Sequence, residues 1–200
     1  FLMANSTSIT YRLKRKILSF TNKISLSLSK PDRKFTADMV YGILSSKSCL
    51  LTDISDQLHE SSRKANTVKR LSNHLAVGTP ASAAASYLRT VKKLVPSEPV
   101  VLIDESDVVK PDGKQFESLG IVRDGSESTQ TKNVYKKGYH VTEACALTAH
   151  KHPISVFSRI HSSAEKDYKS VNTITFDAIK QAAALFGKAT FVMDRGYDDN

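Results

Sequence analysis

Two aspartates stand directly after short apolar segments, a position from which carboxylates can bind metal ions. Asp104 follows the run Val100–Ile103, and Asp194 follows the run 189–193. If the two segments are neighbouring strands, both carboxylates lie at the sheet edge where open α/β sheets bind their ligands. Carboxylates this close repel each other unless a hard divalent cation neutralises them. The pair therefore predicts a two-metal site for phosphoryl transfer, with one cation activating the attacking oxygen and the other stabilising the leaving oxygen.

The same pattern has a structural interpretation, and neighbouring acidic groups compete for the metal role. Asp is common in strand-end caps and turns, where its side chain hydrogen-bonds to nearby backbone groups. Asp104 and Asp194 could have this structural role without binding a metal ion. Asp107 is a competing first ligand, but its flanking residues place it past the end of the strand. Glu105 alternates to the opposite side from Asp104 if the strand continues. The acidic pair 198–199 favours the start of a further helix.

Basic and amide side chains in the first half of the chain predict contacts with nucleic acid. Amphipathic helices are expected over residues 51–59 and 64–77, joined by a short polar turn. The second has what a recognition helix needs, because apolar residues can dock on a partner helix while polar groups face phosphates and base edges. The alternative is a solvated face on an ordinary helical bundle. The predicted DNA-binding residues of this helix and its start are Arg63, Lys64, Lys69, Arg70, Asn73 and His74.

A second basic cluster lies near the N-terminus and predicts an arm that contacts phosphates rather than base edges. Its members are Arg12, Lys14, Arg15 and Lys16.

The secondary structure that must position these groups is predicted to change from helices to strands near Pro96. Residues 8–95 are predicted to be helical throughout. One helix is expected over 35–47 with Thr36 as its N-cap, and another is opened by Pro80. We therefore expect an all-α DNA-binding region over residues 1–95.

The region from residue 97 onwards has the pattern of an α/β domain. The apolar run at residues 100–103 predicts a strand buried on both faces. Residues 105–136 are polar and predict mostly irregular structure, with one short apolar segment at 119–122. A hairpin is expected over 139–148 and 153–160. A helix over about 174–186, closed by a glycine, and a strand over 189–193 complete the order.

Composition and charge narrow the classes of function. The chain has 200 residues and a formal net charge of +9, which points to a polyanionic partner, either nucleic acid or an acidic membrane surface. Its longest aliphatic run is four residues, far below the roughly 20 apolar residues of a membrane-spanning helix. No secretory signal is recognisable. Two cysteines cannot form a zinc cluster or a disulfide framework, so we expect free thiols in a reducing compartment.

Three segments resemble the transposases of bacterial insertion sequences that carry a DDE catalytic triad on a ribonuclease-H-like fold. They are PVVLIDESDVVKPDGKQFESLGIVRDGS, KKGYHVTEACALT and ATFVMDRGYDDN. In that family the first catalytic Asp ends the first core strand, with a hydroxyl residue two positions on, as in Asp104 and Ser106. The second ends the fourth strand and precedes an Arg, as in Asp194 and Arg195. The resemblance covers most of residues 97–200 and is weaker over 1–95.

The resemblance implies a function and its partners. Asp104 and Asp194 would be the catalytic residues and would bind Mg²⁺, with Mn²⁺ as a substitute, for phosphodiester cleavage followed by strand transfer. Arg195 would contact DNA. The partners would be double-stranded DNA, both transposon ends and target, and a second copy of the chain in a homodimer. The expected location is the bacterial cytoplasm, on the nucleoid.

The third carboxylate of the family, a Glu on a later helix, has no counterpart in residues 1–200. We therefore expect the chain to be an N-terminal fragment, truncated on the C-terminal side of its mixed-sheet core and inactive by itself. Two other interpretations stay open. One is a catalytically inactive DNA-binding remnant, and the other is a nuclease of the same fold that cuts without joining.

Overall fold

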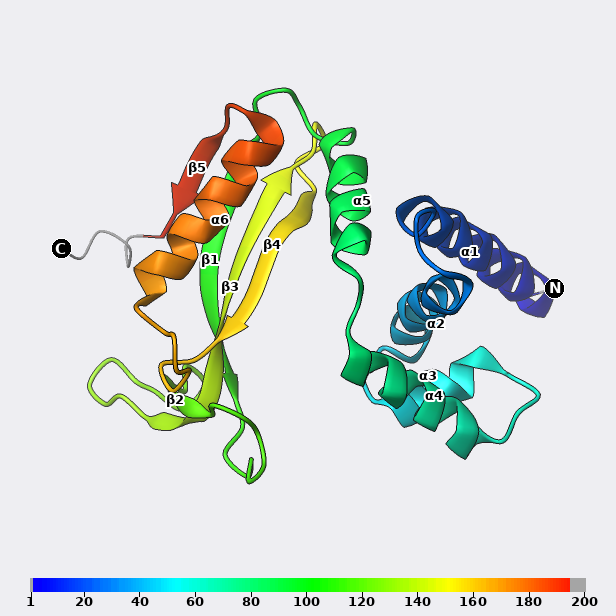
Figure 1. Cartoon of the computed structure of the whole chain (residues 1–200), viewed down its shortest axis with the longest axis horizontal. Helices are drawn as coiled ribbons and strands as arrows, with labels where there is room; N and C mark the ends of the chain where they lie inside the picture. Colours follow the sequence, from blue (N-terminus) through cyan, green and yellow to red (C-terminus); the bar gives the residue numbers. More distant parts are fainter. Residues whose placement is uncertain (1, 195–200) are drawn as a thin grey trace. The chain divides into compact units, whose positions relative to one another are not determined.

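The structure is a computed structural model that describes residues 2–194 (Figure 1). This part of the chain is a mixed α+β protein with six helices and one mixed five-stranded sheet. It divides between Thr90 and Val91 into two compact units, called here the helical unit (residues 2–90) and the sheet unit (residues 91–194). The division lies slightly before Pro96, where the sequence pattern changes from helices to strands.

Five helices begin in the helical unit. Their bounds are α1 Leu2–Ile24, α2 Lys30–Ser46, α3 Leu51–Leu58, α4 Lys64–Val77 and α5 Ala81–Lys92.

Helix α2 begins earlier than the sequence pattern predicts. Its N-cap is Ser29, whose side chain accepts a hydrogen bond from the Asp32 N–H, and a proline lies in its first turn. This is a favourable start for a helix, because the cap and the proline suit backbone positions that lack helical partners. The expected N-cap, Thr36, is therefore wrong: it lies inside the helix and donates to the Asp32 carbonyl at 2.8 Å.

The core of the helical unit holds α2, α3 and α4 together. Phe35, Ile54 and Leu71 form its buried cluster, one residue from each helix. Helices α2 and α3 approach closely at Gly42, where an added Cβ would overlap the side chain of Ile54. Helix α4 ends at Gly78, which has the positive φ of +84° that glycine adopts without strain. The apolar face of α4 is thus fixed inward and its opposite face is exposed.

The sheet unit contains one helix and five strands. Their bounds are β1 Val100–Val109, β2 Gly120–Arg123, β3 Tyr135–Leu147, β4 Pro153–His161, α6 Val171–Phe186 and β5 Thr190–Met193. Strand β3 pairs antiparallel with β1, β2 and β4, and β5 pairs parallel with β1.

Strand β3 explains why residues 105–136 contain more strand than the sequence predicts. Residues 105–136 were expected to be mostly irregular, but β1 continues to Val109 and β2 forms at 120–123. Both extensions pair with β3, which begins at Tyr135. Pairing with β3 supplies backbone hydrogen bonds to the polar continuation of β1, and β2 forms at the short apolar segment 119–122.

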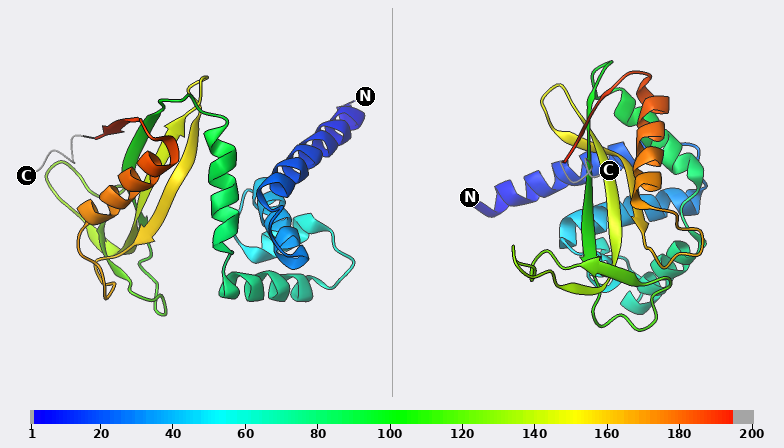
Figure 2. Two further views of the ribbon diagram at one scale, coloured as in Figure 1. Left: turned by 45° about the horizontal axis from the view of Figure 1, so that its top comes forward. Right: turned by 90° about the vertical axis from the view of Figure 1, so that its left-hand side faces the viewer.

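The two faces of the sheet differ sharply. Helix α6 covers one face (Figure 2) and buries Ile174, Ala178 and Ala182, while Val101 and Ile103 of β1 are buried on the sheet side. Within residues 91–194 no helix covers the opposite face. Apolar side chains stay exposed there on four strands, among them Leu102 (β1), Ile121 (β2), Ile160 (β4) and Val192 (β5).

Across residues 2–194, no helix combines the length and the apolar character that crossing a membrane requires. Cys49 and Cys145 are both free thiols.

Candidate catalytic and nucleic-acid-binding sites

The two predicted catalytic aspartates come from adjacent parallel strands. Strands β1 and β5 pair in register from Val100 beside Thr190 to Ile103 beside Met193. The next position along each strand is Asp104 on one and Asp194 on the other. Both residues are exposed. Both aspartates therefore follow the last registered pair, Ile103 and Met193, at the same end of the β1–β5 pairing.

Asp104 lies on the uncovered face of the sheet. Side chains alternate along β1, so Asp104 lies on the same face as Leu102. Ile103 and Glu105 point to the other face, which α6 covers. The Asp104 carboxylate accepts a hydrogen bond from the Glu105 N–H at 2.9 Å. The strand does not end at this aspartate, as the sequence suggested, but the side chain still faces solvent from a fixed backbone.

A third carboxylate, which the sequence pattern did not reveal, lies beside this pair. Glu143 of β3 is the cross-strand partner of Asp104, so the two side chains occupy the same face. Its Oε1 accepts a hydrogen bond from the Cys145 thiol at 3.8 Å. Glu143 on β3, Asp104 on β1 and Asp194 directly after β5 thus belong to three neighbouring strands of the sheet. This arrangement becomes visible only when the strand pairing is known.

The donor set suits a hard cation only in part. Carboxylate oxygens are the ligands that Mg²⁺ prefers, and like charges on adjacent strands favour its binding. Within residues 2–194, however, no group of three or more acidic, His or Cys side chains converges closely enough to hold a metal ion. Asp104 and Asp194 alone would supply at most part of a coordination shell.

Asp107, the competing first ligand, is on the other face of the sheet. It lies within β1 rather than in a loop beyond it, and its carboxylate is 2.7 Å from His140 Nδ1. The expected loop position is wrong because β1 is longer than its apolar run. Asp107 is thus separated from Asp104 by the sheet itself.

Glu105 belongs to a buried polar network under α6. The fully buried His161 places Nε2 2.8 Å from Thr142 Oγ1 and 3.5 Å from Glu105 Oε1. Burial raises the pKa of Glu105 and lowers the pKa of His161. These groups anchor β1 to β3 and β4 directly behind Asp104, an arrangement that fixes the strand.

The N-terminal basic cluster lies on a regular helix. All four residues are exposed on α1, and the Lys14 ammonium lies 4.8 Å from the ring centre of Tyr41 on α2. Helical geometry places Arg12, Arg15 and Lys16 on one side of α1, away from Lys14. The expected arm is therefore a helix face with three cations on it.

Most of the predicted DNA-binding cations of α4 have partners inside the protein. Arg70 Nη2 lies 2.7 Å from Asp38 and 3.1 Å from Glu60, and Lys64 Nζ lies 2.7 Å from Asp56. These ion pairs tie α4 to α2 and α3.

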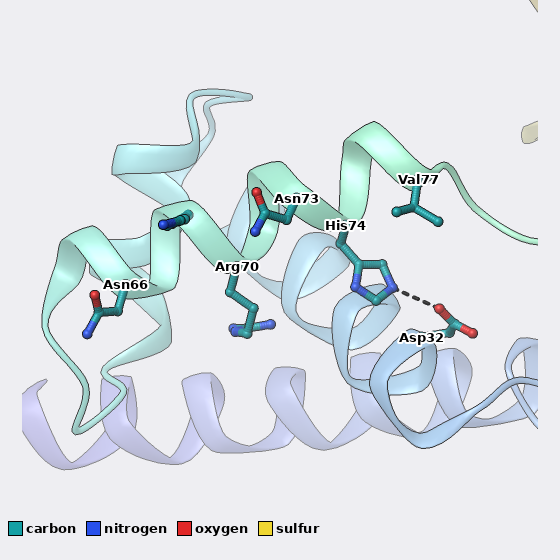
Figure 3. Close-up of a pocket in the computed structure, with 7 residues that line it drawn as sticks. Asp32, Asn66, Arg70, Asn73, His74 and Val77 are labelled. Carbon is teal, nitrogen blue, oxygen red and sulfur yellow. Dashed lines mark hydrogen bonds and ion pairs between the residues drawn. The ribbon is translucent and has the colours of Figure 1, made fainter.

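His74 is held in the same way. Its Nε2 lies 2.8 Å from Asp32, and its ring stacks on Phe35 at 4.4 Å between centroids (Figure 3). Three of the predicted contacts, Lys64, Arg70 and His74, therefore have structural partners that the sequence pattern did not reveal.

An open groove runs along α4 beside these ion pairs. Its volume is about 530 Å³, and Figure 3 shows its lining residues. They are Asp32, Asn66, Lys69, Arg70, Asn73, His74 and Val77. Arg63 is exposed as the N-cap residue before α4.

Glu60 is expected to contribute to the acid sensitivity of the helical unit. The Lys34 ammonium lowers the pKa of Glu60 from 4.5 to about 2, with further contributions from Thr67 and Arg70. A carboxyl whose pKa is lower in the folded state stabilises it above the unfolded pKa, and this stabilisation is lost as pH falls. We expect the stability of the helical unit to fall between about pH 4.5 and about pH 2. Chemical denaturation at a series of pH values measures this.

Glu60→Gln tests the assignment. It should cost about 1 kcal/mol at neutral pH, given a partly solvated ion pair, and should flatten the acid-dependent loss. Asp56→Asn is the matched control, because it removes a carboxylate that pairs with Lys64, and both side chains of that pair are half exposed. An equal acid response in wild type and Glu60→Gln would show that Glu60 is not its source.

The net charge of the chain belongs entirely to its first half. Residues 1–90 contain 14 Lys and Arg and 5 Asp and Glu, a net charge of +9, whereas residues 91–200 contain 15 of each. The boundary coincides with the division between the two units. The excess of positive charge thus lies in the helical unit, and residues 91–200 are neutral overall.

Arg195, also predicted to contact DNA, and the acidic pair 198–199 lie outside the described residues. Comparison of the sequence with protein-family models and with curated proteins finds no match. Function is therefore inferred from the residues and geometry of the two sites.

Proposed function

We propose that the chain is the N-terminal part of a DDE transposase, with a helical DNA-binding unit and a ribonuclease-H-like catalytic core. The observation that supports this proposal is the parallel pairing of β1 with β5, whose last registered pair, Ile103 and Met193, is followed in the chain by Asp104 and Asp194. The order of strands supports it: β1 is flanked by antiparallel β3 and parallel β5, with β4 outside β3 and α6 between β4 and β5 in the chain. The resemblance implies a strand, a hairpin, a helix and a strand in chain order, which correspond to β1, β3 with β4, α6 and β5. The short strand β2 is an addition, so Asp194 follows the fifth strand rather than the expected fourth.

The site would work through phosphodiester exchange. Bound divalent cations would activate the attacking oxygen and neutralise charge on the leaving oxygen. The carboxylates of Asp104 and Asp194 would hold those cations, and the Glu105–His161–Thr142 network would keep β1 in place behind Asp104. The third carboxylate of the site is proposed to lie outside residues 1–200.

The chemistry needs no covalent enzyme intermediate. Water first attacks a phosphodiester at the element's end, the P–O bond to the 3′ oxygen breaks, and a 3′-hydroxyl is released. That hydroxyl then attacks a target phosphodiester, forming a new P–O bond as the target strand's bond breaks. In-line displacement of this kind depends on positioning and charge stabilisation, which rigid strands can supply.

Metal binding by the 200-residue chain tests the site directly. We expect Mn²⁺ titration followed by electron paramagnetic resonance to show binding that weakens at least about tenfold in Asp104→Asn and in Asp194→Asn, since each loses one of few carboxylate ligands. Asp112→Asn, an exposed loop carboxylate with the same change in charge, is the control. Binding that is unchanged in both Asp104→Asn and Asp194→Asn would refute the site.

A further inference from the structure

The exposed face of α4 carries a stripe of side chains at helical spacing. Asn66, Lys69, Asn73 and Val77 follow one another at intervals of three, four and four residues, which places them along one side of the helix. All four are exposed, Val77 by 88%. Leu71 and Thr67 on the inner side are buried. The stripe therefore faces away from the core of the helical unit.

The stripe differs from the neighbouring cations in having no partners. Among residues 2–194, the side chains of Asn66, Lys69 and Asn73 make no hydrogen bond or ion pair, whereas Arg70 and His74 bind carboxylates of α2. Figure 3 shows the His74 ring directed at Asp32. Arg70 and His74 thus position the helix and leave the stripe available.

The chemistry of the stripe suits base edges better than phosphates. A surface that only contacts phosphates uses cations, but two of the three polar groups here are amides, each with a donor and an acceptor. An Asn amide pairs bidentately with N6 and N7 of adenine in the major groove, and an apolar side chain contacts the thymine methyl group. No acidic residue occurs in α4 to oppose the phosphates.

We propose that α4 is a recognition helix in which Asn66 and Asn73 read adenines through the major groove, Lys69 contacts a phosphate, and Val77 contacts a thymine methyl. This inference rests on the proposed function only in taking duplex DNA as the partner. The +9 net charge of residues 1–90 is complementary to that partner. The stripe faces the outside of a helix packed on two others, and an α-helix fits the major groove in this way.

The test uses the 200-residue chain and a randomised duplex library. Selection should enrich sites that contain adenines, and fluorescence anisotropy then gives affinities for the selected duplex. Replacing a read adenine with 7-deaza-adenine, which lacks N7, should weaken wild-type binding about tenfold. In Asn66→Ala, binding should become insensitive to 7-deaza-adenine at the adenine that Asn66 reads. In Asn73→Ala, the same should hold for the adenine that Asn73 reads.

Charge and base readout separate in the same experiment. Lys69→Ala should reduce the slope of log K against log[salt] by about 1, whereas Asn73→Ala should leave the slope unchanged because no phosphate contact is lost. Ser72→Ala, exposed on α4 but outside the stripe, is the control and should match wild type.

The outcomes distinguish this inference from the proposed function. DNA binding without base preference, or with a preference that Asn66→Ala and Asn73→Ala leave intact, overturns the recognition face but not the catalytic proposal. Adenine-selective binding by a chain that fails the metal test supports the recognition face alone. Absence of duplex binding at low salt overturns both the recognition face and the proposed DNA-binding unit.

Discussion

Asp104→Asn is expected to reduce metal-dependent DNA cleavage about a thousandfold while leaving duplex affinity unchanged. The substitution keeps the shape of the side chain but removes the charge that would hold a cation in the proposed site. Metal ions contribute several kcal/mol of charge stabilisation to such transition states, and about 4 kcal/mol corresponds to a thousandfold in rate. The measurement is cleavage of labelled duplex DNA in Mg²⁺ by a form of the protein that includes the third carboxylate, alongside anisotropy titrations.

The opposite face of β1 offers a matched control. Asp107→Asn removes a carboxylate only three residues away that pairs with His140 instead, so cleavage should change little. Loss of DNA binding together with activity in Asp104→Asn would mean that Asp104 has a structural role. Loss of activity in Asp107→Asn alone would move the metal site to the covered face.

The 200-residue chain by itself is expected to be inactive in this assay. Asp104-dependent cleavage by this chain would place the third ligand within residues 1–200. Glu143 would then be the first residue to test, because it is the cross-strand partner of Asp104 on the uncovered face. Glu143→Gln should in that case reduce cleavage as strongly as Asp104→Asn.

Local patterns in the sequence predicted several elements well. Helix α4 spans 64–77, as its apolar spacing and Gly78 indicated, and α3 spans 51–58 against an expected 51–59. The hairpin of β3 and β4 and the helix before β5 were also recognisable. Each of these depends on periodicity or on a stop signal within the element itself.

Pairing over long distances in the chain could not be predicted in the same way. The continuation of β1 past Asp104 depends on β3, more than thirty residues later, and the position of Glu143 opposite Asp104 depends on their register. The ion pair of Arg70 is with Asp38, on another helix. The sequence therefore could not show which cations of α4 form ion pairs within the protein and which side chains remain available for a partner. That distinction requires the positions of the carboxylates on the neighbouring helices.

Leu71→Ala is expected to have a large effect on the stability of the helical unit. Leu71 is fully buried with Phe35 and Ile54, so truncation removes packing from all three helices of the cluster at once. Substitutions of this type cost about 2–5 kcal/mol, which is a large part of the stability of a small domain. Urea denaturation followed by circular dichroism measures the loss.

Leu75→Ala is the control, because Leu75 lies one turn further along α4 and is 49% exposed. Its truncation should cost less than about 1 kcal/mol, since little apolar surface is transferred to water. DNA affinity should follow stability: at temperatures where Leu71→Ala unfolds the helical unit, Asn66, Lys69 and Asn73 lose their common face and binding is lost with it. If Leu71→Ala costs no more than Leu75→Ala, the buried cluster does not hold α4 in place, and the Arg70 and His74 ion pairs must orient the helix instead.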